Sequence, residues 1–75
     1  MAQSTFRPGQ NVAPHTHVDA TEIVFVLKGT ASIVVNGQMV TVGAGSVVVI
    51  SPGETHAFGN TSPTEEMQML YFTIS

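Results

Sequence analysis

Turns that contain glycine or proline divide this chain into short segments, and their close spacing constrains the fold more than any other feature. Asn36-Gly37 separates two apolar runs, and both central residues of a type I′ hairpin turn need the positive φ that Asn and Gly adopt readily. Pro8-Gly9, Gly43-Ala44-Gly45 and Ser51-Pro52-Gly53 mark further turns. The short runs between them are rich in β-branched and aromatic residues, which favour strands.

The pattern predicts an all-β fold of about eight strands, arranged as a barrel or jelly-roll sandwich. The predicted strands cover residues 3–7, 11–18, 22–28, 30–35, 38–42, 46–50, 55–60 and 67–75. One alternative concerns the last segment. Ser62-Pro63-Thr64-Glu65 has the form of a helix capping box with proline at the first helical position, so a helix through residues 65–74 would also fit. Residues 71–74, Tyr-Phe-Thr-Ile, favour the strand instead.

Length and composition indicate one domain, residues 1–75, that needs support beyond its own core. Seventy-five residues lie near the lower limit for an unassisted hydrophobic core, and the chain has no cysteine with which to form a disulfide. Charged residues make up 9% of the chain and apolar residues 43%, against a usual charged share of about a quarter. We therefore expect a bound metal ion, a partner subunit or both.

The charge balance argues against nucleic-acid binding. Arg7 and Lys28 are the only arginine and lysine, and the formal net charge is −3, so no basic patch for a phosphate backbone can form. The N-terminal residues lack the apolar region of a secretion signal, and no stretch approaches the length of a membrane span. We expect a cytoplasmic protein without nucleic-acid or membrane partners.

Two histidines two positions apart are the first candidates for chemistry. On a strand, residues i and i+2 point to the same side of the sheet, so His15 and His17 would face one place. Glu22 opens the next strand, and the turn-prone residues between allow the chain to reverse and bring its carboxylate close. Two imidazoles and a carboxylate are suitable ligands for a borderline transition-metal ion.

At this point the sequence resembles a known family, the cupin superfamily. Gly9, His15, His17, Glu22 and Gly29 have the spacing of the first cupin motif. The second motif is similar to residues 45–60, with Gly45, Gly53, His56 and Asn60 at the family's positions. Ser51 stands where a proline is usual, and Pro52 comes one position late, which is a local departure. The resemblance covers most of the chain.

The resemblance implies a small jelly-roll β-barrel with a divalent transition metal held by His15, His17, Glu22 and His56. Similar proteins bind iron, manganese, copper, nickel or zinc at this place. They include dioxygenases, isomerases and epimerases, together with modules that store or sense ligands without catalysis, so fold and site leave the activity open. An alternative for the histidines is a metal-free pocket in which they hydrogen-bond to Glu22 and water.

The strand after Glu22 has two different faces. Val24 and Val26 share the side of Glu22 and should point into the barrel, while Ile23, Phe25 and Leu27 form a second apolar face. An apolar face of this kind needs a cover, and in so short a chain a second subunit can supply it. We predict a homodimer in which the exposed sheets of two subunits pack together.

The residues around the site suggest a small organic ligand but do not select a reaction. Phe58, Met67, Met69 and Tyr71 could line the pocket or only fill the core, and Asn60 is expected to stabilise a turn. The sequence offers neither an evident acid–base pair nor an interior arginine that would bind a carboxylate or phosphate. Two hypotheses follow, a metal-dependent oxygenase-type enzyme and a non-catalytic metal or small-ligand binding or sensing module.

Overall fold

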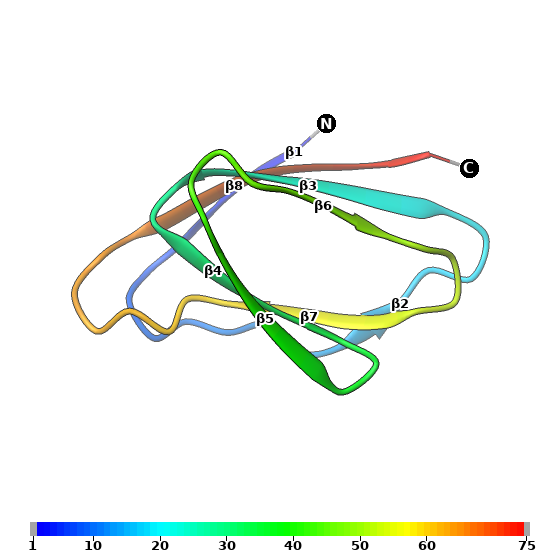
Figure 1. The fold of residues 1–75 in the computed structure, drawn as a ribbon, viewed down its shortest axis with the longest axis horizontal. Helices are drawn as coiled ribbons and strands as arrows, with labels where there is room; N and C mark the ends of the chain where they lie inside the picture. Colours follow the sequence, from blue (N-terminus) through cyan, green and yellow to red (C-terminus); the bar gives the residue numbers. More distant parts are fainter. Residues whose placement is uncertain (1, 75) are drawn as a thin grey trace.

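The computed structural model describes residues 2–74, and within this range the chain forms eight β-strands and no helix (Figure 1). The strands form two four-stranded antiparallel sheets with the orders β1-β8-β3-β6 and β2-β7-β4-β5. The all-β prediction is therefore confirmed. The bounds are β1 (Ala2–Phe6), β2 (His15–Thr16), β3 (Thr21–Lys28), β4 (Thr30–Val35), β5 (Gln38–Gly43), β6 (Val47–Ile50), β7 (Thr55–Gly59) and β8 (Met67–Ile74).

The two sheets face each other and enclose the hydrophobic core. In Figure 1 the sheet β1-β8-β3-β6 forms the upper layer and the sheet β2-β7-β4-β5 the lower layer. Val24 and Val26 of β3 are fully buried, as their alternation with Ile23 and Phe25 predicts. The buried apolar side chains are Phe6, Val24, Val26, Ala31, Ile33, Ile50, Phe58, Met67 and Met69.

The hairpin between β4 and β5 has the predicted backbone geometry. Asn36 has φ 49° and Gly37 has φ 83°, which are the two positive values that a type I′ turn needs. Gly29, between β3 and β4, also has a positive φ of 78°, and a Cβ atom at this position would collide with the backbone carbonyl oxygen of Glu66. Glycine at position 29 therefore serves two purposes, the turn and the close approach of a neighbouring segment.

The strand that carries His15 is shorter than predicted. We expected residues 11–18, whereas β2 contains only His15–Thr16, and Asn11 makes an isolated bridge to Gly59. The Val12 amide still donates to the carbonyl of Phe58 at 3.0 Å. Pro14 has no amide hydrogen to donate and lies between these two contacts, which accounts for the interrupted pairing.

The last segment is a strand, and the sequence that resembles a capping box forms a turn. The Ser62 hydroxyl accepts hydrogen bonds from the amides of Thr64, at 3.3 Å, and Glu65, at 2.9 Å, so the local cap forms without a helix after it. β8 then runs between β1 and β3. Pairing on both sides outweighs the local helix signal. Ser75, the end of the predicted strand, lies outside the described residues.

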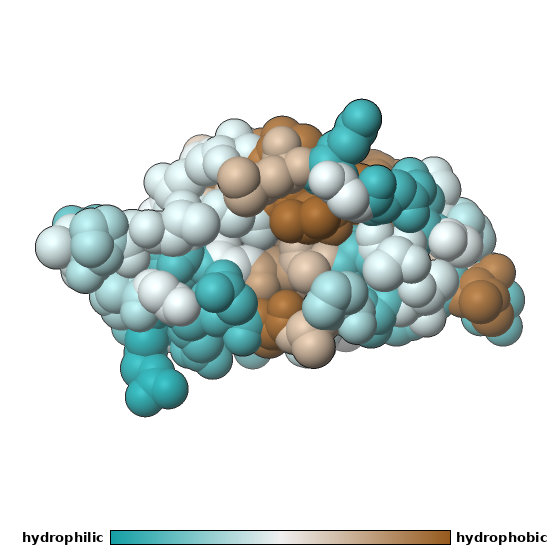
Figure 2. Space-filling model, turned by 90° about the horizontal axis from the view of Figure 1, so that it is seen from below, coloured by the Kyte–Doolittle hydropathy of each residue, from teal (hydrophilic) through white to brown (hydrophobic). Residues whose placement is uncertain are grey.

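The outer faces of the two sheets differ. Phe25, Val47, Val49, Phe72 and Ile74 are exposed apolar side chains on β3, β6 and β8, so the outside of the sheet β1-β8-β3-β6 is largely apolar. Figure 2 views the opposite sheet, where polar surface surrounds a central apolar hollow. Residues 2–74 contain no helix long and apolar enough to cross a membrane.

Candidate metal centre

Strand pairing brings the first and the last histidine together. His15 on β2 lies directly opposite His56 on β7, and their ring centroids are 4.2 Å apart. His56 in turn lies opposite Val35 of β4, so the third strand of the sheet fixes its place. His15 is exposed, whereas His56 is 1% exposed. The pairing of β2 with β7 therefore joins two histidines that are distant in the sequence.

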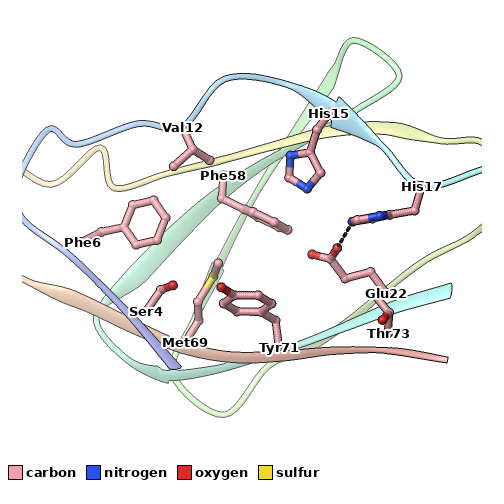
Figure 3. A pocket seen from close by; sticks show the side chains of 10 residues that line it. All are labelled: Ser4, Phe6, Val12, His15, His17, Glu22, Phe58, Met69, Tyr71 and Thr73. Carbon is pink, nitrogen blue, oxygen red and sulfur yellow. Dashed lines mark ion pairs between the residues drawn. The ribbon is translucent and has the colours of Figure 1, made fainter. Parts of the chain in front are cut away.

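The remaining two candidates complete the cluster from the loop and from the opposite sheet. His17 follows β2 directly, and its Nε2 lies 3.0 Å from Oε2 of Glu22 (Figure 3). Glu22 is near the start of β3, in the other sheet, and is 3% exposed. The same carboxylate oxygen lies 3.3 Å from Nε2 of His56. The site thus spans the space between the two sheets.

All four predicted ligands meet at one place. One ligand atom from each of His15, His17, Glu22 and His56 lies within 4.8 Å of the other three. Metal–nitrogen and metal–oxygen bonds of about 2.0–2.2 Å put the donor atoms of one ion within roughly 4.4 Å of one another. Small side-chain adjustments would therefore let the four residues share an ion.

The hydrogen bonding of His56 fits a metal ligand. Its Nδ1 lies 3.0 Å from the backbone carbonyl oxygen of Glu54, and because a carbonyl only accepts, Nδ1 carries the hydrogen. In the neutral ring Nε2 is then a bare lone pair. This buried atom has no hydrogen-bond partner among residues 2–74, although the Glu22 carboxylate lies near it. A cation such as a metal ion between these two electron-rich atoms would make their close approach in this buried place favourable.

A pocket of about 300 Å³ opens beside the cluster (Figure 3). Phe58, Met69 and Tyr71, three of the four residues considered for the pocket, line it, whereas Met67 belongs to the core. The sequence interpretation missed the rest of the wall. Ser4 and Phe6 lie on β1, which pairs with β8, and their register opposite Met69 and Met67 was not evident from local sequence. The missed lining residues are Ser4, Phe6, Val12 and Thr73.

Comparison with known families agrees with this geometry. A family model described as a cupin domain matches residues 2–73. The chain belongs to the cupin family. Within this cupin, the four candidate ligands come from both sequence motifs, while Asn60 of the second motif lies outside the cluster and hydrogen-bonds to backbone.

Individual relatives differ in what their names say. The cupin is 34% identical over 64 residues to an oxalate-binding protein of Thermotoga maritima, covering 85% of this chain and 53% of that protein. It is 39% identical over 62 residues to the HTH-type transcriptional activator RhaS of Klebsiella pneumoniae, covering 83% of this chain and 22% of the activator. The chain thus spans about half of the first relative and about a fifth of the second.

A solved structure shares the fold closely. The crystal structure of a protein of Thermotoga maritima described as a predicted oxalate decarboxylase superposes with a TM-score of 0.90 at 30% identity. The match covers 96% of this cupin and 62% of that chain. The two-sheet architecture and the strand order that builds the cluster are therefore those of a cupin.

Proposed function

We propose that this cupin binds one divalent transition-metal ion through His15, His17, Glu22 and His56, and that a small organic molecule binds beside the ion in the adjoining pocket. The observation that carries the proposal is the unpaired Nε2 of buried His56 facing the carboxylate of Glu22. Imidazole and carboxylate suit iron, manganese, copper, nickel and zinc, so the donor set supports a metal of this group without selecting one.

Each residue has a distinct role in this proposal. The Glu54 carbonyl orients the His56 ring and fixes its tautomer, which supports ligation through Nε2. Glu22 supplies the negative charge, and its placement in the opposite sheet joins the two layers at the site. His15 and His17 border the pocket and leave the ion accessible from that side. When bound, the metal would supply Lewis-acid or redox chemistry.

A binding or sensing role is the activity we favour. Among the described pocket residues, the polar side chains besides the candidate ligands are the hydroxyls of Ser4, Tyr71 and Thr73, which do not form an acid–base pair. The name of one similar protein, an oxalate-binding protein, also fits ligand binding. We propose a module that recognises a small molecule through its metal.

Oxygenase-type catalysis is the second candidate function. The pocket reaches His15, His17 and Glu22 directly, so a small molecule could contact the metal and lie against an apolar wall that excludes water. Such chemistry relies on the metal and oxygen, and needs few acid–base groups from the protein. Oxygen uptake by protein loaded with iron, manganese or copper, measured with candidate ligands, would distinguish it from simple binding.

Elemental analysis of untagged protein tests the metal site. We expect about one equivalent of a transition metal in the parent protein and little in His56→Ala. Ser51→Ala is the control, because Ser51 is exposed in the turn before β7 and its only bond to a side chain is made by its backbone amide. It should retain the metal. Absence of metal from the parent, even after incubation with iron, manganese, copper, nickel and zinc, would contradict the proposal.

We also propose that the apolar outer face of the sheet β1-β8-β3-β6 pairs with a second copy of the chain. Val49 is 60% exposed and Phe25 is 38% exposed, and they lie on neighbouring strands. The four strands, of five, eight, eight and four residues, present roughly 400 Å² in projection. Two such faces would bury about 800 Å², the size of a weak interface.

Oligomeric state measured by light scattering or sedimentation tests the dimer. Val49→Lys places a charge in the middle of the apolar face and should give a monomer. Thr41→Lys, on the exposed part of β5 in the other sheet, is the matched control and should leave the dimer intact. A parent protein that stays monomeric at high micromolar concentration would refute this part of the proposal.

A further inference from the structure

The charges around the pocket limit what can bind beside the metal. A divalent ion with the Glu22 carboxylate and three neutral imidazoles has a net charge of about +1. The described pocket lining contains neither lysine nor arginine. Lys28 lies elsewhere, 3.9 Å from a carboxylate oxygen of Glu66. One negative charge on the ligand would therefore neutralise the site, and a second would remain uncompensated in an apolar surrounding.

We infer that the pocket selects a singly charged organic acid with an apolar body, rather than a dianion such as oxalate. This inference rests on the metal site proposed above and adds the ligand's charge and shape to it. The acid end would lie at the cluster. It would bind the metal through a carboxylate oxygen and a neighbouring oxygen, as in a 2-oxo acid.

The arrangement of the pocket wall agrees with such a ligand. Figure 3 shows His15, His17 and Glu22 at one end of the pocket. Phe6 and Val12 lie at the other end, with Phe58 and Met69 between. A carbon chain extending from the metal would meet apolar side chains along its length. Phe6, Phe58 and Met69 are each buried, so this wall is held in place by the core. Apolar groups on the ligand would bind favourably against this surface, and a second carboxylate would have no partner there.

The cavity volume sets the size of the ligand. About 300 Å³ is at the lower end for small-molecule sites, and part of this space adjoins the metal cluster. A short carbon chain fits this space beside the acid group. The hydroxyls of Ser4 and Tyr71 also line the pocket and could hydrogen-bond to an oxygen at the acid end. The inferred class is thus a small 2-oxo acid with a short apolar chain, or a close analogue.

Two similar proteins, the oxalate-binding protein and the predicted oxalate decarboxylase, have names that point to oxalate. The charges around the pocket of this cupin do not fit that ligand. Oxalate carries a negative charge on each of its two carboxylates, so at the cluster it would leave one charge uncompensated beside the apolar wall of Val12, Phe58 and Met69. Burying that charge without a cation is unfavourable by a wide margin. Pyruvate has a methyl group in place of one charged carboxylate oxygen of oxalate, so the pair tests the second charge directly.

The first test measures affinity along a ligand series by isothermal titration calorimetry. The protein is loaded with Co²⁺, its metal content is measured, and pyruvate, 2-oxobutyrate and 2-oxoisovalerate are titrated in turn. We expect affinity to rise about fourfold for each added carbon, whereas aqueous Co²⁺ should show no such trend. A flat or falling series in metal-loaded protein would overturn the inference. Failure to load Co²⁺ would instead contradict the metal site itself.

The second test supplies the missing cation. Val12 lines the pocket and is 37% exposed, so Val12→Lys can place an ammonium group at the wall without burying it, and Val12→Gln is the neutral control. Oxalate affinity should be about tenfold or more higher in Val12→Lys than in Val12→Gln, with pyruvate affected less. Equal oxalate affinities in the two metal-loaded variants would refute the charge argument. A parent protein whose affinity for oxalate exceeds its affinity for pyruvate by the same ratio as aqueous Co²⁺ would also refute it.

Discussion

His56 lies near the start of β7 and Asn60 directly follows this strand; both side chains are almost fully buried, but their hydrogen bonding differs. The Asn60 amide donates to the carbonyls of Phe6, Arg7 and Glu65, at 3.2, 3.2 and 2.7 Å, and its oxygen accepts from the Ser62 amide at 3.1 Å. His56 has a partner for Nδ1 and none, within residues 2–74, for Nε2.

The difference separates a structural group from one that is free to bind. Asn60 joins the end of β1 to the turn before β8, and both hydrogens of its side-chain amide are used in these bonds. His56 keeps a lone pair at a buried place where a missing partner is unfavourable. A polar group that a fold leaves unsatisfied in its interior is the better candidate for function, and burial alone would not have distinguished the two.

The largest expected effect is on stability, in Asn60→Ala. The substitution removes the Asn60 partner of three carbonyls and one amide, but the Arg7 carbonyl keeps the Gln10 amide at 3.0 Å. At about 1 kcal/mol or more for each of the other three groups, we expect a loss of roughly 3–4 kcal/mol. Urea unfolding followed by circular dichroism, with EDTA present to remove any metal, measures it. A loss under 1 kcal/mol would show that water replaces these bonds and that Asn60 is not the structural member of the pair.

A metal ion should stabilise the protein through His56 and without help from Asn60. At a free Zn²⁺ concentration a hundred times its Kd, we expect about 2.7 kcal/mol of added stability in the parent protein and little in His56→Ala. Asn60→Ala should gain the same increment as the parent, because its side chain does not take part in the cluster. If the gain in stability from the metal disappears in Asn60→Ala, the metal cluster and the surroundings of Asn60 are coupled.

Glu22→Gln should change metal affinity and the stability of the metal-free protein in opposite directions. The glutamine amide can donate a hydrogen bond to Nε2 of His56, which faces the carboxylate oxygen at 3.3 Å in the parent. We expect metal-free protein to become about 1 kcal/mol more stable, while metal affinity falls by more than about 100-fold, because the lost group is the anionic ligand itself and not an outer partner of a ligand. Unfolding curves with EDTA and metal titrations measure the two effects. Lower stability in the metal-free variant would contradict our account of the unpaired atom.

The sequence predicted the parts of this molecule that depend on neighbours along the chain. Asn36-Gly37 indicated its hairpin because the turn itself requires those residues, and the alternation of Val24 and Val26 with Phe25 indicated the inner face of β3. His15 and His17 were paired on the same local grounds. The sequence did not show how short β2 is, because the pairing of residues 11–18 depends on β7, and Pro14 interrupts it.

The rest of the site depends on contacts between distant segments. Nothing in the residues near His56 places it beside His15, and it was assigned only through the family's second motif. Val12 and Ser4 joined the pocket wall through the packing of the two sheets, which periodicity does not reveal. The capping-box sequence at residues 62–65 was correctly set aside, since β1 and β3 pair with both sides of the segment that follows.

The smallest expected effect comes from the matched amide, Asn11→Ala. Asn11 is exposed, and its side-chain amide donates a single long hydrogen bond, 3.5 Å, to the Gly9 carbonyl. Water can replace that bond, so the loss of stability should be about 0.5 kcal/mol or less, measured as for Asn60→Ala. The two substitutions remove the same chemical group, so the gap between them measures what burial and saturated bonding contribute. A cost similar to that of Asn60→Ala would mean that losing any asparagine near β7 disturbs the sheet, and the distinction between Asn60 and His56 would then need another basis.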